Sequence, residues 1–151
     1  MTLHAAHDAL THSPPTPNSK EPLKDFSRRT FLSKETLSNI RIQIREIAWK
    51  CAGVVRSEEG MKEGLTKVTA LEKELKGIIP QTISSRKLKY DLTSAAFVLK
   101  AILTASLSRE ESRGAFIRED FPQQDDLKWQ RNSCLVYDIM EESFSLRYGM
   151  G

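Results

Sequence analysis

Three long segments of this chain carry apolar residues at alternating spacings of three and four, and this pattern limits the fold more than any other feature. Such spacing places the apolar side chains on one face of an α-helix, which must then be covered by neighbouring helices. The segments cover residues 33–53, 58–77 and about 84–109, with short polar connections between them. They predict a mainly α fold, in which three helices form an antiparallel bundle.

Residues at the segment ends predict where each helix begins and stops. Ser33 and Ser57 are expected N-caps, because a serine hydroxyl can accept a hydrogen bond from a free backbone amide. Gly53 and Gly77 are expected to end the first two helices. The third helix should begin near Ser84 or Ser85. Its inner face is expected to consist of Leu88, Leu92, Ala95, Ala96, Leu99, Ile102, Leu103 and Ser106.

The chain after Gly114 loses the helical pattern. Phe121 precedes a proline, which holds the backbone extended and favours a loop wrapped over the helices. A short turn capped by Asp125 or Asp126 should hold Trp129. Two alternating segments then predict a short C-terminal β-hairpin, 133–137 and 143–148. Because two strands alone are marginally stable in water, this hairpin needs a surface to pack on.

The start of the chain differs in composition from the rest. It is rich in Ser, Thr, Pro and Asn and cannot bury enough apolar surface to offset the entropy of ordering. The expected division is therefore a disordered or loosely ordered tail at 1–32, the three-helix bundle at 33–110, and the loop and hairpin at 111–151, which belong to the same domain. All three histidines lie in the tail, so histidine-based catalysis and histidine-ligated zinc are not expected in the folded part.

Several classes of site and location can be assessed from composition and motifs. The glycines are too scattered to form a phosphate-binding loop. Acidic residues are interleaved with the lysines and the net charge is only +3, so nucleic acid is not an expected partner. The longest uninterrupted apolar runs are short, so no membrane span is expected. No secretory signal is visible and two distant cysteines form no framework, which favours a cytoplasmic location. No catalytic, cofactor-binding or metal-ligating residue is predicted.

The run from Arg109 to Pro122 is different in kind, because it gathers several charged groups around Gly114. Arg109 and Arg113 are four residues apart and would project from one side of the helix end, near its negative pole. Two guanidiniums placed there could hold carbonyl and carboxylate groups of a facing domain. The alternative is an ordinary solvated helix terminus.

This run also resembles a known family. The sequence Glu-Ser-Arg-Gly-Ala at 111–115, followed by Arg118, Asp-Phe-Pro at 120–122, two aspartates and Trp129, resembles the C-terminal helical domain of succinate dehydrogenase and fumarate reductase flavoproteins. L-aspartate oxidase and adenylylsulfate reductase are similar members. Residues 44–56 are similar to the first helix of that domain. The resemblance extends over about residues 36–148.

The resemblance implies a role as well as a fold. Residues 1–35 resemble neither the FAD-binding domain nor the substrate-capping domain of the family, and Phe116 stands where the family usually has His. The chain is therefore expected to be a non-catalytic piece of a flavin-dependent oxidoreductase, which leaves open whether it counts as an enzyme. FAD would be held not by this chain but by a partner domain or subunit. The expected contact residues are Arg109, Glu111, Arg113, Arg118 and Trp129.

The parent family moves a hydride between flavin N5 and a dicarboxylate, or reduces adenylylsulfate at the same position. The chain could be a separate subunit or a detached fragment of such an enzyme. An alternative from another class is a free-standing helical interaction module or regulator without a redox role. This alternative predicts that Arg113→Ala leaves association with a flavoprotein unchanged.

Overall fold

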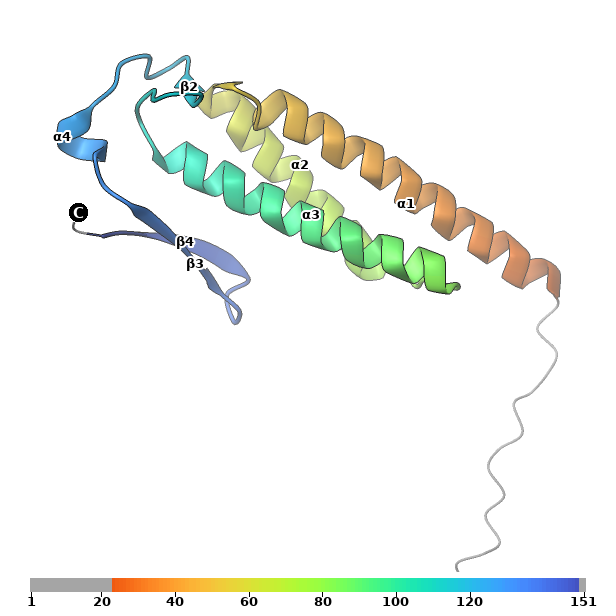
Figure 1. Ribbon diagram of the computed structural model, residues 1–151. Coiled ribbons are helices and arrows are strands. Elements are labelled where there is room, and N and C mark those ends of the chain that lie inside the picture. Colours follow the sequence, from red (N-terminus) through yellow and green to blue (C-terminus); the bar gives the residue numbers. More distant parts are fainter. Residues whose placement is uncertain (1–22, 150–151) are drawn as a thin grey trace, which may run out of the picture.

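The computed structural model describes residues 23–149, with side chains described from residue 34 onward. Three long helices lie side by side, and the middle one in sequence runs opposite to the other two (Figure 1). They are α1 (Leu23–Cys51), α2 (Glu58–Gly77) and α3 (Ile83–Ser108). The shorter elements are β1 (Val55–Arg56), β2 (Ile117–Arg118), α4 (Asp126–Trp129), β3 (Ser133–Asp138) and β4 (Ser143–Tyr148). The predicted helical fold and terminal hairpin are confirmed.

One hydrophobic core is shared by the three long helices. Each helix contributes the residues of its three-four stripe, as expected for amphipathic helices that cover one another. The buried apolar residues are Leu37, Ile40, Ile44, Ile47, Cys51, Met61, Val68, Leu71, Leu75, Leu92, Ala96, Leu99 and Leu103. Terminal strands β3 and β4 pair antiparallel and pack on α3 through aromatic rings, since Phe97 contacts both Tyr137 and Phe144.

Two residues expected on the inner face of α3 are exposed instead. Ile102 keeps 41% of its surface accessible, and Ala95 is also exposed. Consecutive helical residues are turned by about 100°, so each of them faces away from the adjacent core residue, Leu103 or Ala96. The prediction was wrong here because α3 is apolar over more of its circumference than α1 and α2 can cover.

Helix boundaries agree with the sequence analysis at most ends. Ser57 caps α2 by accepting a hydrogen bond from the amide of Gly60 at 3.2 Å. Helix α3 is capped by Thr82, slightly earlier than expected, in a reciprocal capping box with Ser85. The first helix is different, since it begins at Leu23 and continues through Ser33.

Ser33 was the wrong choice of cap, because α1 already begins at Leu23 and serine has only a modest cost inside a helix. The part of the predicted tail that follows residue 22 is therefore helical. Residues 1–22, which contain the three histidines, lie outside the described residues.

Helix α3 is also distinctive in its hydropathy. Among residues 23–149 it is the one helix that is long and apolar enough, by length and composition, to cross a membrane. Short apolar runs argue against any span, but one 18-residue window of α3 has a mean hydropathy of 1.3, which is higher than those runs suggest. In the structure α3 packs against both α1 and α2 through one face. Its apolar character is that of a core helix with part of its surface left uncovered.

The three helices approach closely at Gly64 of α2. A Cβ atom at this position would lie 2.8 Å from the Cβ of Cys51 in α1 and 3.1 Å from a methyl carbon of Leu103 in α3. Real Cβ atoms do not come within 2.8 Å of another heavy atom, so any larger residue at this position would force the helices to shift.

We expect Gly64→Ala to lower the free energy of unfolding by about 1–3 kcal/mol, because the added methyl group forces the helices apart. Gly77→Ala is the matched control on the same helix, since a Cβ there would meet no atom within 4 Å. Its effect should stay within about 0.5 kcal/mol. Urea unfolding of both variants measures the difference, and equal destabilisation would contradict the close crossing.

Candidate functional site

One end of the bundle brings together the C-terminal ends of α1 and α3 and the N-terminal end of α2. The segment that follows α3 crosses this end and forms β2, close to β1 (Figure 1). Strands β1 and β2 pair parallel, with Val55 opposite Ile117 and Arg56 opposite Arg118. The short pairing fixes two arginines beside helix ends that expose backbone carbonyls.

Arg56 caps the C-terminal end of α1. Its Nε donates to the carbonyl of Gly53 at 2.7 Å, and its Nη2 donates to the carbonyl of Ala52 at 3.0 Å. The remaining guanidinium nitrogen donates to the hydroxyl of Ser106 in α3, and the cation lies over the ring of Phe116. A cation at this pole satisfies carbonyls that have no partner within the helix. Arg56 thereby ties α1 to α3.

Arg118 has the same role at the end of α3 but is almost completely buried, with 1% of its surface exposed. Its Nη1 donates to the carbonyls of Ser106, Leu107 and Arg109 at 3.0, 3.2 and 2.9 Å. The rest of the guanidinium forms a two-pronged ion pair with Asp120. A buried cation needs such full hydrogen bonding, because desolvation without partners is very costly.

Asp120 carries this network to the third helix end. One carboxylate oxygen accepts a hydrogen bond from the backbone amide of Glu58 at 3.2 Å, in the first turn of α2. The hydrogen bond from Arg118 is the main reason that the pKa of Asp120 is lowered. An ionised carboxylate at a helix N-terminus and a guanidinium at a C-terminus each complement the local helix dipole.

Glu111 is the second charged centre and has no exposed surface. Its carboxylate accepts hydrogen bonds from Arg109, from Arg113 at 3.1 and 3.2 Å, and from the amide of Asp125 at 3.0 Å. Burial raises the pKa of this carboxyl, but the hydrogen bonds from Arg113, Asp125 and Arg109 together outweigh it and hold the pKa at about 2. Glu111 is therefore ionised at neutral pH.

The route by which Arg109 and Arg113 reach Glu111 differs from the prediction. Helix α3 ends at Ser108, so the two arginines do not lie four residues apart on one helical face. Instead, Arg113 and Phe116 exchange backbone hydrogen bonds at 2.8 and 2.9 Å across a tight turn. Gly114 has a φ of 57° in this turn, a conformation that glycine adopts without strain.

Trp129 of α4 is buried, with 4% of its surface exposed. The cations of Arg109, Lys128 and Arg131 lie 5.5, 5.0 and 5.7 Å from the centre of its ring, and the ring meets Tyr148 of β4 in an edge contact at 5.6 Å. The indole Nε1 is buried, with no hydrogen-bond partner among the described residues. Asp125 caps the short helix α4 that carries Trp129, as predicted.

The structure thus gathers all five predicted contact residues at one end of the bundle. Glu111, Arg118 and Trp129 are buried within the chain, whereas the side chains of Arg109 and Arg113 remain 23% and 36% exposed. Their contacts within the chain hold the segment after α3 onto the helix ends. Their contact with a partner domain stays a prediction, in which only the exposed edges of Arg109 and Arg113 could take part.

Two residues of this network had no assigned role in the sequence analysis, Arg56 and Asp120. A basic residue just beyond a helix-ending glycine is a known signal for carbonyl capping, and it could have identified Arg56. Asp120 had no comparable signal, because the amide that it binds lies 62 positions away in the sequence.

The arrangement has little capacity for chemistry of its own. Glu111 and Asp120 are ionised and engaged by guanidinium groups, so neither is set up to transfer a proton near neutral pH. Within the described part of the chain, no three His, Cys, Asp or Glu side chains form a group that could hold a metal ion. The geometry is that of a structural network.

Comparison with known proteins identifies the family. The profile described as "Fumarate reductase flavoprotein C-term" matches residues 41–150, which is most of the chain. The chain belongs to this family. It is 30% identical over 94 residues to an uncharacterised FAD-dependent oxidoreductase of Methanocaldococcus jannaschii, covering 62% of this chain and 17% of that protein. It is 30% identical over 111 residues to a subunit of fumarate reductase (CoM/CoB) from Methanothermobacter marburgensis, covering 71% of this chain and 20% of that protein.

A solved structure confirms the fold of the domain. Adenylylsulfate reductase from Archaeoglobus fulgidus superposes with a TM-score of 0.71 at 16% sequence identity, over 80% of this chain and 22% of that one. The chain therefore spans less than a quarter of the length of the proteins to which it is compared. The family assignment confirms the resemblance inferred from the Glu-Ser-Arg-Gly-Ala segment.

We expect Glu111→Gln to lower the free energy of unfolding at pH 7 by about 3 kcal/mol, because it leaves Arg109 without a carboxylate partner and Arg113 with only the exposed Asp126. The pKa of Glu111 falls from 4.5 to about 2 on folding, so its contribution is present above pH 4.5 and is lost as the pH falls toward 2. The difference between wild type and variant should therefore shrink over this range, as measured by urea unfolding at a series of pH values.

Glu110→Gln is the control for this experiment. Glu110 pairs with Lys128 on the surface, where both side chains are about half exposed, and such pairs contribute little. A Glu110 variant as unstable as the Glu111 variant, or a Glu111 effect independent of pH, would contradict the role assigned to the buried carboxylate.

Proposed function

We propose that this chain is a non-catalytic helical domain that packs on an FAD-bearing domain or subunit of a flavin-dependent oxidoreductase. The family membership and the length of the relatives, of which this chain spans 17% and 20%, support a larger enzyme. One of these relatives is described as FAD-dependent and the other as a fumarate reductase subunit. The cofactor and the reacting groups would then lie in the partner, and the reaction would be oxidation or reduction at flavin N5.

The observation that carries the proposal is the uncovered side of α3. Ala95, Val98 and Ile102 follow a helical spacing of three and four and form a second apolar strip beside the core strip. Val98 and Ile102 are 53% and 41% exposed. A helix that is apolar over most of its circumference is typical of the buried interior of a larger protein. A partner domain that packs on this strip would remove its apolar surface from water.

Helix α1 also exposes two large apolar side chains. Ile42 and Trp49 are seven residues apart on the same face, opposite the core residues, and are 54% and 83% exposed. Large aromatic side chains are enriched in protein interfaces, so Trp49 is a further proposed contact for a partner. Arg109 and Arg113 are the proposed polar contacts, through their exposed edges.

A cytoplasmic location belongs to the same proposal. Both cysteines are free, and Cys134 is exposed on β3. An exposed free thiol is typical of proteins that work in a reducing compartment.

We expect Val98→Glu to prevent association with the flavoprotein. The tagged chain, expressed in its native host in place of the natural copy, should recover an FAD-containing polypeptide, identified by mass spectrometry and by the visible absorbance of the flavin. Because Val98 would be buried in the contact, an unpaired carboxylate there should reduce recovery about tenfold or more. Thr66→Glu, which adds the same charge to an exposed position of α2, is the control.

The outcome also separates the two classes of function. Both variants should retain wild-type helical content, because neither position is buried in the chain. A free-standing helical module would recover no flavin-containing polypeptide with the wild-type chain. Equal recovery with wild type and Val98→Glu would show that the α3 strip is not the docking surface.

A further inference from the structure

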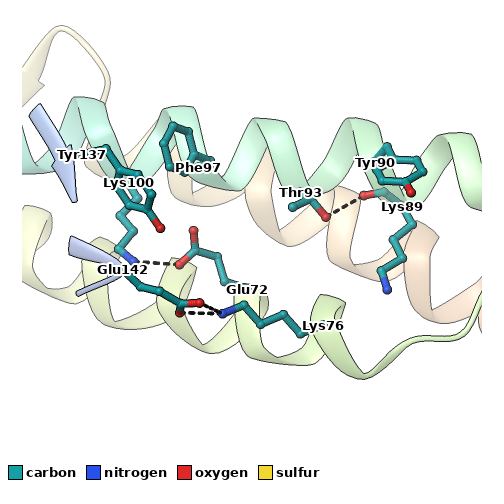
Figure 2. A pocket seen from close by; sticks show the side chains of 9 residues that line it. All are labelled: Glu72, Lys76, Lys89, Tyr90, Thr93, Phe97, Lys100, Tyr137 and Glu142. Atoms are coloured by element: carbon teal, nitrogen blue, oxygen red, sulfur yellow. Dashed lines mark hydrogen bonds and ion pairs between the residues drawn. The ribbon is translucent and has the colours of Figure 1, made fainter. Parts of the chain in front are cut away.

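A cavity of about 400 Å³ opens between α2, α3 and the terminal hairpin (Figure 2). It lies on the side of α3 that faces α2 and not on the side that carries Val98 and Ile102. None of the residues that line it belongs to the charged network around Glu111. Neither the family assignment nor the proposed docking uses this cavity, and its lining combines aromatic rings with lysine ammonium groups (Figure 2).

The aromatic part of the cavity has two ends. At one end the rings of Phe97 and Tyr137 meet edge to face at 4.8 Å, which also fixes the hairpin on α3. At the other end Tyr90 is 68% exposed. Tyr90 and Phe97 are seven residues apart on the same helix, or about 10 Å along its axis. The small side chain of Thr93 lies between them, so a flat ring system has room to lie there.

Among the described residues, the charges around the cavity leave one cation without a counter-ion. Lys100 pairs with Glu72 at 2.9 Å, and both side chains are only about 20% exposed. Lys76 pairs with Glu142 of the hairpin at 2.6 Å. Lys89 donates to the carbonyl of Ile78 at 2.6 Å but contacts no carboxylate in the described part of the chain.

The described lining therefore has three ammonium groups against two carboxylates. A ligand with a single negative charge would balance Lys89, whose ammonium has further protons to donate. A ligand with several negative charges would face repulsion from Glu72 and Glu142.

We propose that this cavity binds a small aromatic carboxylate, with its ring between Tyr90 and Phe97 and its carboxylate on the ammonium of Lys89. Aromatic rings at both ends supply apolar contact area and favourable edge-to-face geometry. Small-molecule sites typically combine apolar and aromatic contacts with a few polar groups that fix the orientation of the ligand, and Lys89 is the cation of this lining without a carboxylate partner among the described residues. The occupant would make an ion pair and would displace no existing one.

The test uses 2-naphthoate as the probe, titrated into the isotope-labelled full chain and followed by NMR. Saturable shifts are expected for the amides of the cavity residues in α3 and the hairpin. Lys89→Met should weaken binding about fivefold to tenfold, because a hydrogen bond to a charged group is lost. Lys87→Met is the matched control, since Lys87 is an exposed lysine of the same helix that does not line the cavity.

A neutral analogue and a variant that fills the cavity serve as two further controls. The neutral analogue 2-naphthalenemethanol should bind the wild type and Lys89→Met equally, because it has no charge to place on Lys89. Thr93→Trp should abolish binding of both probes by filling the slot, and its exposed position should leave the fold intact. Absence of saturable shifts in the wild type, or equal loss of naphthoate affinity in the Lys89 and Lys87 variants, would overturn the proposal.

Discussion

The buried guanidinium of Arg118 is the interaction on which the rest of this structure depends. It satisfies three carbonyls at the end of α3 and pairs with Asp120, which in turn binds an amide at the start of α2. Arg56 joins α1 to the same place. Helix ends carry unsatisfied backbone groups, and three such ends lie together here. One ion pair and one further arginine therefore replace the water that would otherwise solvate them.

The segment after α3 owes its conformation to this end of the bundle. The carboxylate of Glu111 holds this segment in place, because it accepts hydrogen bonds from two arginines and from the backbone amide of Asp125. The aromatic contacts of Trp129 and Phe97 then attach the terminal hairpin to the helices. The opposite side of α3 has no such cover from the described part of the chain, which is consistent with a domain that belongs to a larger protein. Helix α3 therefore has one face covered by the other helices and the hairpin, and another face that stays exposed.

The sequence predicted the number of long helices, the caps at Ser57 and Asp125, and both strands of the hairpin, because each depends on neighbouring residues. The start of α1 could not, since Ser33 fits a helix interior as well as a cap. The buried strip of α3 was only partly predicted, because Ile102 and Leu103 are both apolar and only the position of α1 and α2 decides which is covered. The cluster of charges around Glu111 pointed to a site, but not to burial.

Local pattern by itself determined the long helices and the hairpin, since periodicity is a property of consecutive residues. The Glu-Ser-Arg-Gly-Ala segment carried only a resemblance to the fumarate reductase flavoprotein family, which the match over residues 41–150 then confirmed. Tertiary structure alone decided how the charges are used. Arg56 lies 50 positions before Ser106, and Glu58 lies 62 positions before Asp120, so these pairs meet only when three helix ends converge. Electrostatic partners in a folded protein are set by distance in space, and for buried charges that distance fixes both the hydrogen bonds and the ionisation state.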